Sequence, residues 1–121
     1  MDSKRILIVD DDDLIATSFQ GIMEGAGFEV DTSLNGEDAI KQVRETSYDL
    51  IILDIKLPDI NGDEVAKEIR KFNESVSLVF ITGHPSLQKC IDILDLRVSD
   101  ILLKPITPEE LLITVKDEIY D

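Results

Sequence analysis

The sequence predicts an α/β protein in which helices cover both faces of a parallel sheet. Short apolar runs alternate with segments of helical period about five times along the chain, which is typical of successive βα units. Three of these runs are apolar nearly throughout, as strands buried on both faces should be. The length of 121 residues fits one compact domain with its own core. We therefore expect a single five-unit domain over residues 1–121.

The first two units follow directly from the pattern. The strand expected over residues 5–9 is an apolar run, and the helix expected over 13–26 has Ile15, Phe19 and Ile22 on one face. Gly25 and Gly27 bracket the end of that helix. The second unit is a strand over 29–33 and a helix over 35–45.

The last three units are predicted in the same way. Their strands are expected over 50–53, 78–81 and 101–103, and their helices over 62–73, 86–96 and 107–119. The fourth helix has Leu87, Ile91 and Leu94 on its expected core face. Thr107, with Pro108 and Glu110 after it, is typical of an N-cap with a first-turn proline and a capping box.

Composition excludes several classes of function. The chain has 26 acidic and 12 basic residues and a formal net charge of -14, which argues against direct binding of nucleic acid or an anionic membrane. The single cysteine, Cys90, cannot form an internal disulfide and is interpreted as a small core residue. We find neither a signal peptide nor an apolar stretch of the roughly 18 residues needed to span a bilayer. We expect a cytoplasmic protein.

Four consecutive aspartates, Asp10 to Asp13, directly follow the first apolar run. Asp12 and Asp13 are well placed to cap the first helix and to interact with its dipole. Asp10 and Asp11 lie too early for that role. At the carboxyl end of a strand, where open α/β sheets bind ligands, their oxygens suit a hard divalent cation.

Other polar residues follow the neighbouring strands and should converge on the same rim of the sheet. They are Asp54, Thr82 and Lys104. The carboxylates can hold Mg²⁺, while the hydroxyl and the ammonium suit a phosphoryl group beside it. Asp54 could itself take that phosphoryl group as a covalent nucleophile.

Five segments together resemble the receiver domain of two-component response regulators, in the right order and spacing over essentially the whole chain. They are residues 6–11 (ILIVDD), 49–54 (DLIILD), 57–62 (LPDING), 80–83 (FITG) and 102–105 (LLKP). The resemblance implies a flavodoxin-like, doubly wound (βα)5 fold with strand order 2-1-3-4-5. It also implies a signalling domain that catalyses only its own phosphoryl transfer and slow autodephosphorylation.

The resemblance assigns a role to each residue of the rim. Asp54 would accept a phosphoryl group from a phosphohistidine on a sensor kinase or a phosphotransfer protein. Asp11, Asp54 and the backbone carbonyl of Lys56 would coordinate Mg²⁺, and Asp10 would orient a metal-bound water. The switch hydroxyl and the phosphate-pairing lysine would be Thr82 and Lys104, with a cis bond between Lys104 and Pro105.

The chain also departs from the family pattern. Ile101 stands where an aromatic switch residue is common, and residues 94–99 lack the usual glycine-alanine pair. Ile93 and Leu96 fall to one side of the core face of the fourth helix, and with Ile101 they form either an exposed patch or a face buried by a rotated helix. The exposed patch would favour a homodimer through the fourth helix and fifth strand, or another partner.

Several alternatives accompany this interpretation. His84 is interpreted as a solvated loop residue rather than a catalytic base, and Gly62 as a turn residue that needs a positive φ. A flavin carrier is disfavoured because four anions stand where a flavin phosphate would bind. A phosphohydrolase is disfavoured because Lys56 stands where a second acid or base would be needed beside the nucleophile. The remaining alternative is a phosphorylation-independent interaction domain on the same fold.

Overall fold

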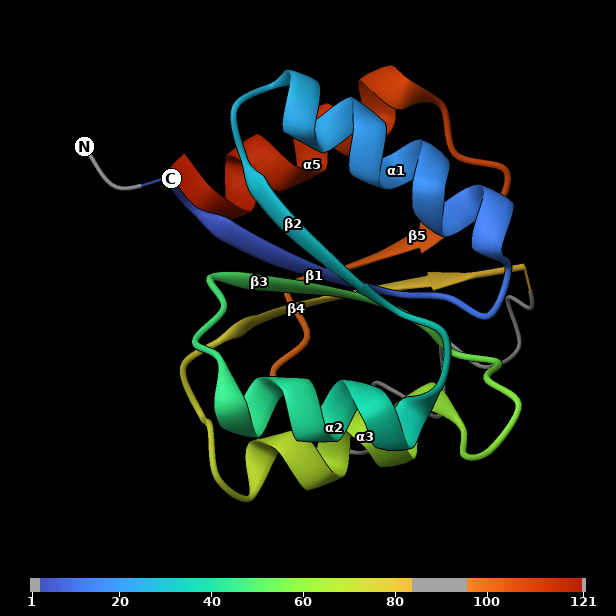
Figure 1. Ribbon diagram of the computed structural model, residues 1–121, viewed down its shortest axis with the longest axis vertical. Helices are drawn as coiled ribbons and strands as arrows, with labels where there is room; N and C mark the ends of the chain where they lie inside the picture. The colour runs from blue at the N-terminus through green and yellow to red at the C-terminus, as the bar shows by residue number, and fades with distance from the viewer. Residues whose placement is uncertain (1–2, 84–95, 121) are drawn as a thin grey trace.

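Five parallel strands form the centre of the molecule, in the order β2-β1-β3-β4-β5 (Figure 1). The structure is a computed structural model that describes residues 3–83 and 96–120. The strands are β1 (Arg5–Val9), β2 (Glu29–Ser33), β3 (Leu50–Asp54), β4 (Ser77–Thr82) and β5 (Asp100–Leu103). The helices among the described residues are α1 (Asp13–Gly25), α2 (Gly36–Glu45), α3 (Gly62–Arg70) and α5 (Pro108–Tyr120). The predicted α/β class and the implied strand order 2-1-3-4-5 are confirmed.

The predicted strands are all present. The bounds of β1 and β2 agree with the prediction, and the other three strands extend one residue further at one or both ends. At the carboxyl ends of β3 and β4 the extension arises because Asp54 pairs with Ile81, and Thr82 pairs with Leu103. Asp54 and Thr82 therefore end their strands rather than follow them.

The helix bounds differ slightly from the prediction. Residue 35 caps α2 and residue 107 caps α5: the Asn35 side chain accepts a hydrogen bond from the Asp38 N–H (2.8 Å), and Thr107 Oγ1 accepts one from the Glu110 N–H (3.1 Å). Helix α3 ends at residue 70 instead of 73, because the Asn73 side chain accepts hydrogen bonds from the N–H groups of Ser75 and Val76 and turns the chain toward β4. The helix expected over 86–96 lies outside the described residues, as do Cys90 and His84, while Leu96 itself is in no helix.

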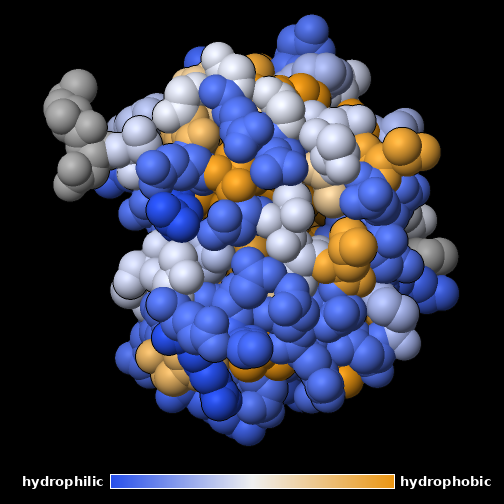
Figure 2. All heavy atoms as spheres, in the orientation of Figure 1, coloured by the Kyte–Doolittle hydropathy of each residue, from blue (hydrophilic) through white to orange (hydrophobic). Residues whose placement is uncertain are grey.

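Helices α1 and α5 cover one face of the sheet, and α2 and α3 cover the other (Figure 1). Alternate residues of each central strand enter two separate cores. In β1, Leu7 and Val9 pack with α2 and α3, whereas Ile6 and Ile8 pack with α1 and α5. The outward face of α2 is largely hydrophilic, as Figure 2 shows. No helix in the described part of the chain is long and apolar enough to cross a membrane.

The segment that leads into β5 lies against the end of α3. The Arg70 guanidinium donates hydrogen bonds to the carbonyls of Leu96 (2.9 Å), Arg97 (3.1 Å) and Val76 (2.8 Å). Arg97 has a φ of 55°, the left-handed region that favours glycine. The segment that lacks the family's glycine-alanine pair therefore contains an arginine in a left-handed conformation.

Of the two alternatives for Ile93, Leu96 and Ile101, exposure does not hold for Leu96, whose side chain is buried. Ile101 is half-buried and packs against the core formed with α2 and α3. Burial of these residues agrees with the alternative in which the face is covered. Ile93 lies outside the described residues, and on β5 the exposed apolar side chain is that of Leu103.

Candidate functional site

The carboxyl ends of the strands bring three carboxylates together at one rim of the sheet. Asp10 follows β1 directly, and its side chain is buried, as is that of Asp54 at the end of β3, whereas Asp11 is exposed. One carboxylate oxygen from each of Asp10, Asp11 and Asp54 lies within 4.8 Å of the others. The structure therefore gathers the predicted acid set from two segments that are far apart in sequence.

Lys104 joins the two buried carboxylates. Its Nζ lies 2.8 Å from Asp54 Oδ2 and 3.3 Å from Asp10 Oδ2. One ammonium among three carboxylates leaves a local charge of about -2. At an effective dielectric constant near 20, two like charges about 5 Å apart repel by roughly 3 kcal/mol. A divalent cation would offset this charge, so the donor set suits a hard cation.

The charges at the rim alter the titration of two groups. Burial raises the pKa of Asp10, and the negative charge of Asp54 adds to this, against the opposing effects of the Asp12 N–H and of Lys104. Desolvation tends to lower the pKa of Lys104, but the hydrogen bond and charge of Asp54, together with Asp10, outweigh it and raise the pKa. Lys104 is therefore held as a cation.

Backbone amides fix the other oxygens of the same carboxylates. Asp10 Oδ1 accepts a hydrogen bond from the Asp12 N–H (2.9 Å), and Asp54 Oδ1 accepts one from the Lys56 N–H (3.1 Å). The side chain of Asp12 caps α1 by accepting hydrogen bonds from the first amides of that helix, and Asp13 lies in the first turn. The predicted capping role of Asp12 is confirmed, whereas the metal-binding role expected for Asp10 and Asp11 stays a prediction.

The remaining predicted residues also lie at this rim. Thr82 is buried at the end of β4, and its carbonyl accepts a hydrogen bond from the Lys104 N–H (2.8 Å), which sets the two residues side by side. The Lys104–Pro105 bond is cis, as the resemblance implied. The side chain of Lys56 is exposed. The metal-binding role expected for its carbonyl stays a prediction.

Gly62 is essential for packing rather than for a turn of positive φ, so the predicted reason for this glycine is wrong. Within residues 3–83 and 96–120, the positive-φ positions are Gly27 and Arg97. An added Cβ at Gly62 would lie 2.8 Å from Ile55 Cα and would also collide with the carbonyl oxygen of Asp54. The Gly62 N–H donates to the Ile55 carbonyl at 2.6 Å. The start of α3 is therefore held against the end of β3.

Sequence reasoning gave no individual role to Asp59. Its two carboxylate oxygens accept hydrogen bonds from the N–H groups of Gly36 (2.8 Å) and Glu37 (2.9 Å), the first two residues of α2. In the sequence, an aspartate after a proline indicates only a turn. No local pattern indicates a partner 22 or 23 residues away.

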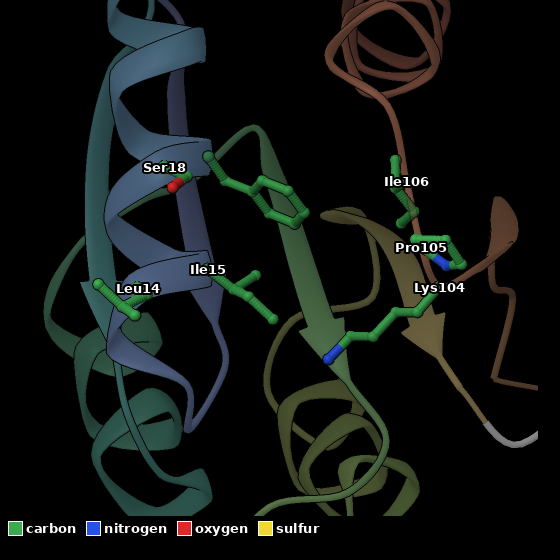
Figure 3. A pocket seen from close by; sticks show the side chains of 7 residues that line it. Leu14, Ile15, Ser18, Lys104, Pro105 and Ile106 are labelled. Atoms are coloured by element: carbon green, nitrogen blue, oxygen red, sulfur yellow. The ribbon is translucent and has the colours of Figure 1, made fainter.

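An apolar groove lies beside Lys104, between α1 and the segment that connects β5 to α5 (Figure 3). It has a volume of about 460 Å³. Its lining residues are Leu14, Ile15, Ser18, Phe19, Lys104, Pro105 and Ile106. Figure 3 shows the Lys104 side chain crossing from this segment toward the end of β3. The groove therefore opens next to the carboxylates.

An α/β domain with strand order 2-1-3-4-5 and an acid cluster paired with a lysine at its carboxyl rim has the architecture of a signal receiver. The chain belongs to the response regulator receiver domain family, whose model matches residues 6–116. Domains of this family act in phosphorylation-based signalling by two-component systems and are not enzymes in the ordinary sense.

Individual relatives agree with this assignment. The chain is 33% identical, over 94% of its length, to the transcriptional regulatory protein ZraR of Klebsiella oxytoca. It resembles the crystal structure of a CheY-like receiver domain protein from Methanospirillum hungatei with a TM-score of 0.93, at 31% identity and coverage of 98% and 95% of the two chains. It also resembles TrrA of Thermotoga maritima, solved in complex with Mg(2+)-BeF, with a TM-score of 0.86 at 36% identity and coverage of 95% and 98%.

The chain spans only part of several relatives. It covers 26% of the length of ZraR of Klebsiella oxytoca and 50% of DltR of Streptococcus agalactiae.

Proposed function

We propose that this receiver domain accepts a phosphoryl group on Asp54 from the phosphohistidine of a sensor kinase or a phosphotransfer protein, in a Mg²⁺-dependent reaction. The observation that carries the proposal is the environment of the Asp54 carboxylate, which lies 2.8 Å from Lys104 Nζ and within the acid cluster. Histidine kinases are the phosphoryl donors of the family.

The acid cluster supports a metal site. Asp11 and Asp54 would coordinate Mg²⁺ with the carbonyl of Lys56, and Asp10 would orient a water on the metal. Bound Mg²⁺ would supply positive charge to phosphoryl oxygens and to the carboxylates around them. The complex of TrrA with Mg(2+)-BeF is a precedent in a relative.

Asp54, Lys104 and Thr82 would each have a distinct role in the phosphoryl transfer. A carboxylate oxygen of Asp54 forms the new bond to phosphorus while the bond from phosphorus to the donor histidine nitrogen breaks. Lys104, held as a cation beside Asp54, pairs with a phosphoryl oxygen, and the Thr82 hydroxyl donates a hydrogen bond to another. Slow hydrolysis of the acyl phosphate would return the domain to its unphosphorylated state.

Phosphorylation would change the charge at the rim and draw Thr82 and Lys104 toward the new oxygens. Because Ile101 replaces the usual aromatic residue, the switch would not depend on an aromatic side chain at that position. The apolar groove beside Lys104 is a suitable contact surface for the donor protein, since it adjoins the acceptor.

Other features of the protein stay predictions. We expect residues 1–121 to act as one receiver domain in the cytoplasm, without direct contact to nucleic acid or membrane. A homodimer through the fourth helix and fifth strand stays a prediction, for which the exposed Leu103 on β5 is the supporting observation.

Intact-mass measurement tests the proposed function. We expect incubation with phosphoramidate or acetyl phosphate and Mg²⁺ to add one phosphoryl group to the protein. The adduct should be absent in Asp54→Asn, because the amide removes the nucleophilic oxygen pair. The matched control is Asp13→Asn, which changes an exposed aspartate of the same run outside the cluster and should leave the adduct intact. A wild-type protein without an adduct would contradict the proposal and favour a phosphorylation-independent interaction domain.

A further inference from the structure

The carboxylate of Asp59 fastens one loop of the site to a neighbouring helix. The loop joins β3 to α3 and contains Lys56. Each oxygen of Asp59 accepts one hydrogen bond, from Gly36 (2.8 Å) and from Glu37 (2.9 Å). These are amides of the first turn of α2, which have no partner inside the helix. The third amide of that turn, from Asp38, is bonded by Asn35.

Close packing reinforces the same contact. An added Cβ at Gly36 would lie 2.6 Å from Ile60 Cγ1 and 2.6 Å from Val65 Cγ2. The loop and α3 therefore lie directly against the start of α2. At its base the loop is closed by the 2.6 Å hydrogen bond from Gly62 to Ile55.

The fastened loop holds the backbone on which the proposed metal site depends. Lys56 lies three residues before Asp59, and its N–H donates to Asp54 Oδ1. Its carbonyl is the expected metal ligand. With the loop closed at Gly62 and tied to α2 at Asp59, the peptide units around Lys56 have little freedom to turn.

We propose that Asp59 is a positioning residue for the metal site, which acts by holding in place the loop that carries the proposed ligand, the carbonyl of Lys56. This inference rests on the proposed function. Asp59 does not contact the acid cluster, so its effect is transmitted through the backbone from residue 56 to residue 59.

The ionisation of Asp59 is consistent with this role. Slight desolvation opposes ionisation, but the hydrogen bonds from the Gly36 and Glu37 amides outweigh it, so the pKa of Asp59 lies below its ordinary value. An ionised carboxylate at the start of a helix also interacts favourably with the helix dipole. The contact therefore persists throughout the neutral pH range.

Calorimetric titration with Mg²⁺ tests the inference. We expect Asp59→Ala to weaken Mg²⁺ binding by roughly 10-fold, the lower end of the effect of residues that orient metal ligands. Asp59→Asn keeps one acceptor oxygen and should weaken it less. The matched control, Glu37→Gln, removes one negative charge from the same helix end but keeps the Asp59 contact with the backbone, and should bind Mg²⁺ nearly as well as the wild type.

Each result separates two explanations. If the Asp59 variants lose stability but keep the wild-type affinity for Mg²⁺, Asp59 is only a helix cap and the inference is wrong. If Glu37→Gln weakens binding as much as Asp59→Asn, the effect is one of charge and the inference is also wrong. Should Asp59→Ala fail to fold, Asp59→Asn decides alone. A wild-type protein that binds no Mg²⁺ would overturn the proposed metal site itself.

Discussion

Arg97 is a residue whose backbone conformation is unfavourable for its type. Its φ of 55° costs a non-glycine residue about 1–2 kcal/mol. The Arg70 guanidinium offsets part of this cost, because it donates to the carbonyls on both sides of the Arg97 Cα, those of Leu96 and of Arg97 itself. The conformation is therefore kept by a side chain from another element rather than by the residue itself.

Replacing Arg97 by glycine should stabilise the protein. Arg97→Gly removes the cost of the left-handed conformation. The greater freedom of glycine in the unfolded chain offsets about 0.5–1 kcal/mol of this gain in stability. We expect a net gain of about 0.5–1 kcal/mol in the free energy of unfolding, measured by urea denaturation. The control Arg97→Ala keeps the penalty. It loses an exposed ion pair with Glu74 and, like the glycine variant, relieves the repulsion between Arg97 and Arg70, so it should resemble the wild type. A glycine variant no more stable than the alanine variant would contradict this account.

At the scale of the elements, the junction between β3 and α3 has no space for a side chain at Gly62. The opposite situation holds at Gly21 in the middle of α1, where an added Cβ would meet no atom within 4 Å. The same substitution should therefore have opposite effects at Gly62 and at Gly21.

Gly62→Ala should destabilise the protein by about 1–3 kcal/mol, the usual range for an added methyl group that forces backbone shifts. Gly21→Ala should stabilise it by about 0.5–1 kcal/mol through helix propensity. Urea denaturation of both variants measures the two effects. If both substitutions change stability in the same direction, the close approach of α3 to β3 is not the determining factor.

The elements could largely be predicted from the sequence, because apolar runs and helical periods are local signals. The pattern placed β1 and β2 correctly but extended α3 to residue 73. The end of α3 depends on the Asn73 side chain, which bonds amides that follow it, and the helical period contains no such signal. The sequence also predicted a structural role for Gly62, but for the wrong reason, a positive φ. The actual reason is the close contact with β3, which depends on how two elements pack and has no local signal in the sequence.

At the scale of the whole molecule, the rim concentrates negative charge in a chain whose formal net charge is already -14. Three carboxylates and one ammonium lie together there. A cation that binds only this folded arrangement should stabilise the fold by mass action. The gain is about 2.7 kcal/mol when the ligand is about 100-fold above its Kd.

Thermal unfolding with increasing Mg²⁺ measures this coupling. We expect the Tm of the wild-type protein to rise by several degrees, and Asp11→Ala to show a much smaller rise because it removes a proposed ligand. Without metal, Asp11→Ala should be at least as stable as the wild type, since repulsion among the carboxylates is reduced. Asp13→Ala is the control outside the cluster and should respond to Mg²⁺ like the wild type. An equal response in Asp11→Ala would remove Asp11 from the metal site.

The candidate site could be predicted to the extent that it follows from strand ends. Parallel strands bring Asp10, Asp54, Thr82 and Lys104 to one rim, and this topology was available from the alternation of elements. The contact of Asp59 with α2 could not be predicted, because both partners lie in connecting segments whose paths are set by packing. The groove beside Lys104 could not be predicted either, because its walls are α1 and the connecting segment at residues 104–106, whose relative positions are set by packing.

The pairing of Lys104 with the carboxylates has a consequence for protein synthesis. Lys104 lies 94 residues after Asp10 and 50 residues after Asp54. A nascent chain that has not yet released its fifth strand from the ribosome contains all three carboxylates but not the lysine that pairs with Asp10 and Asp54. The acceptor therefore acquires its counterion only when the last strand joins the sheet, and an unfinished chain lacks the assembled site.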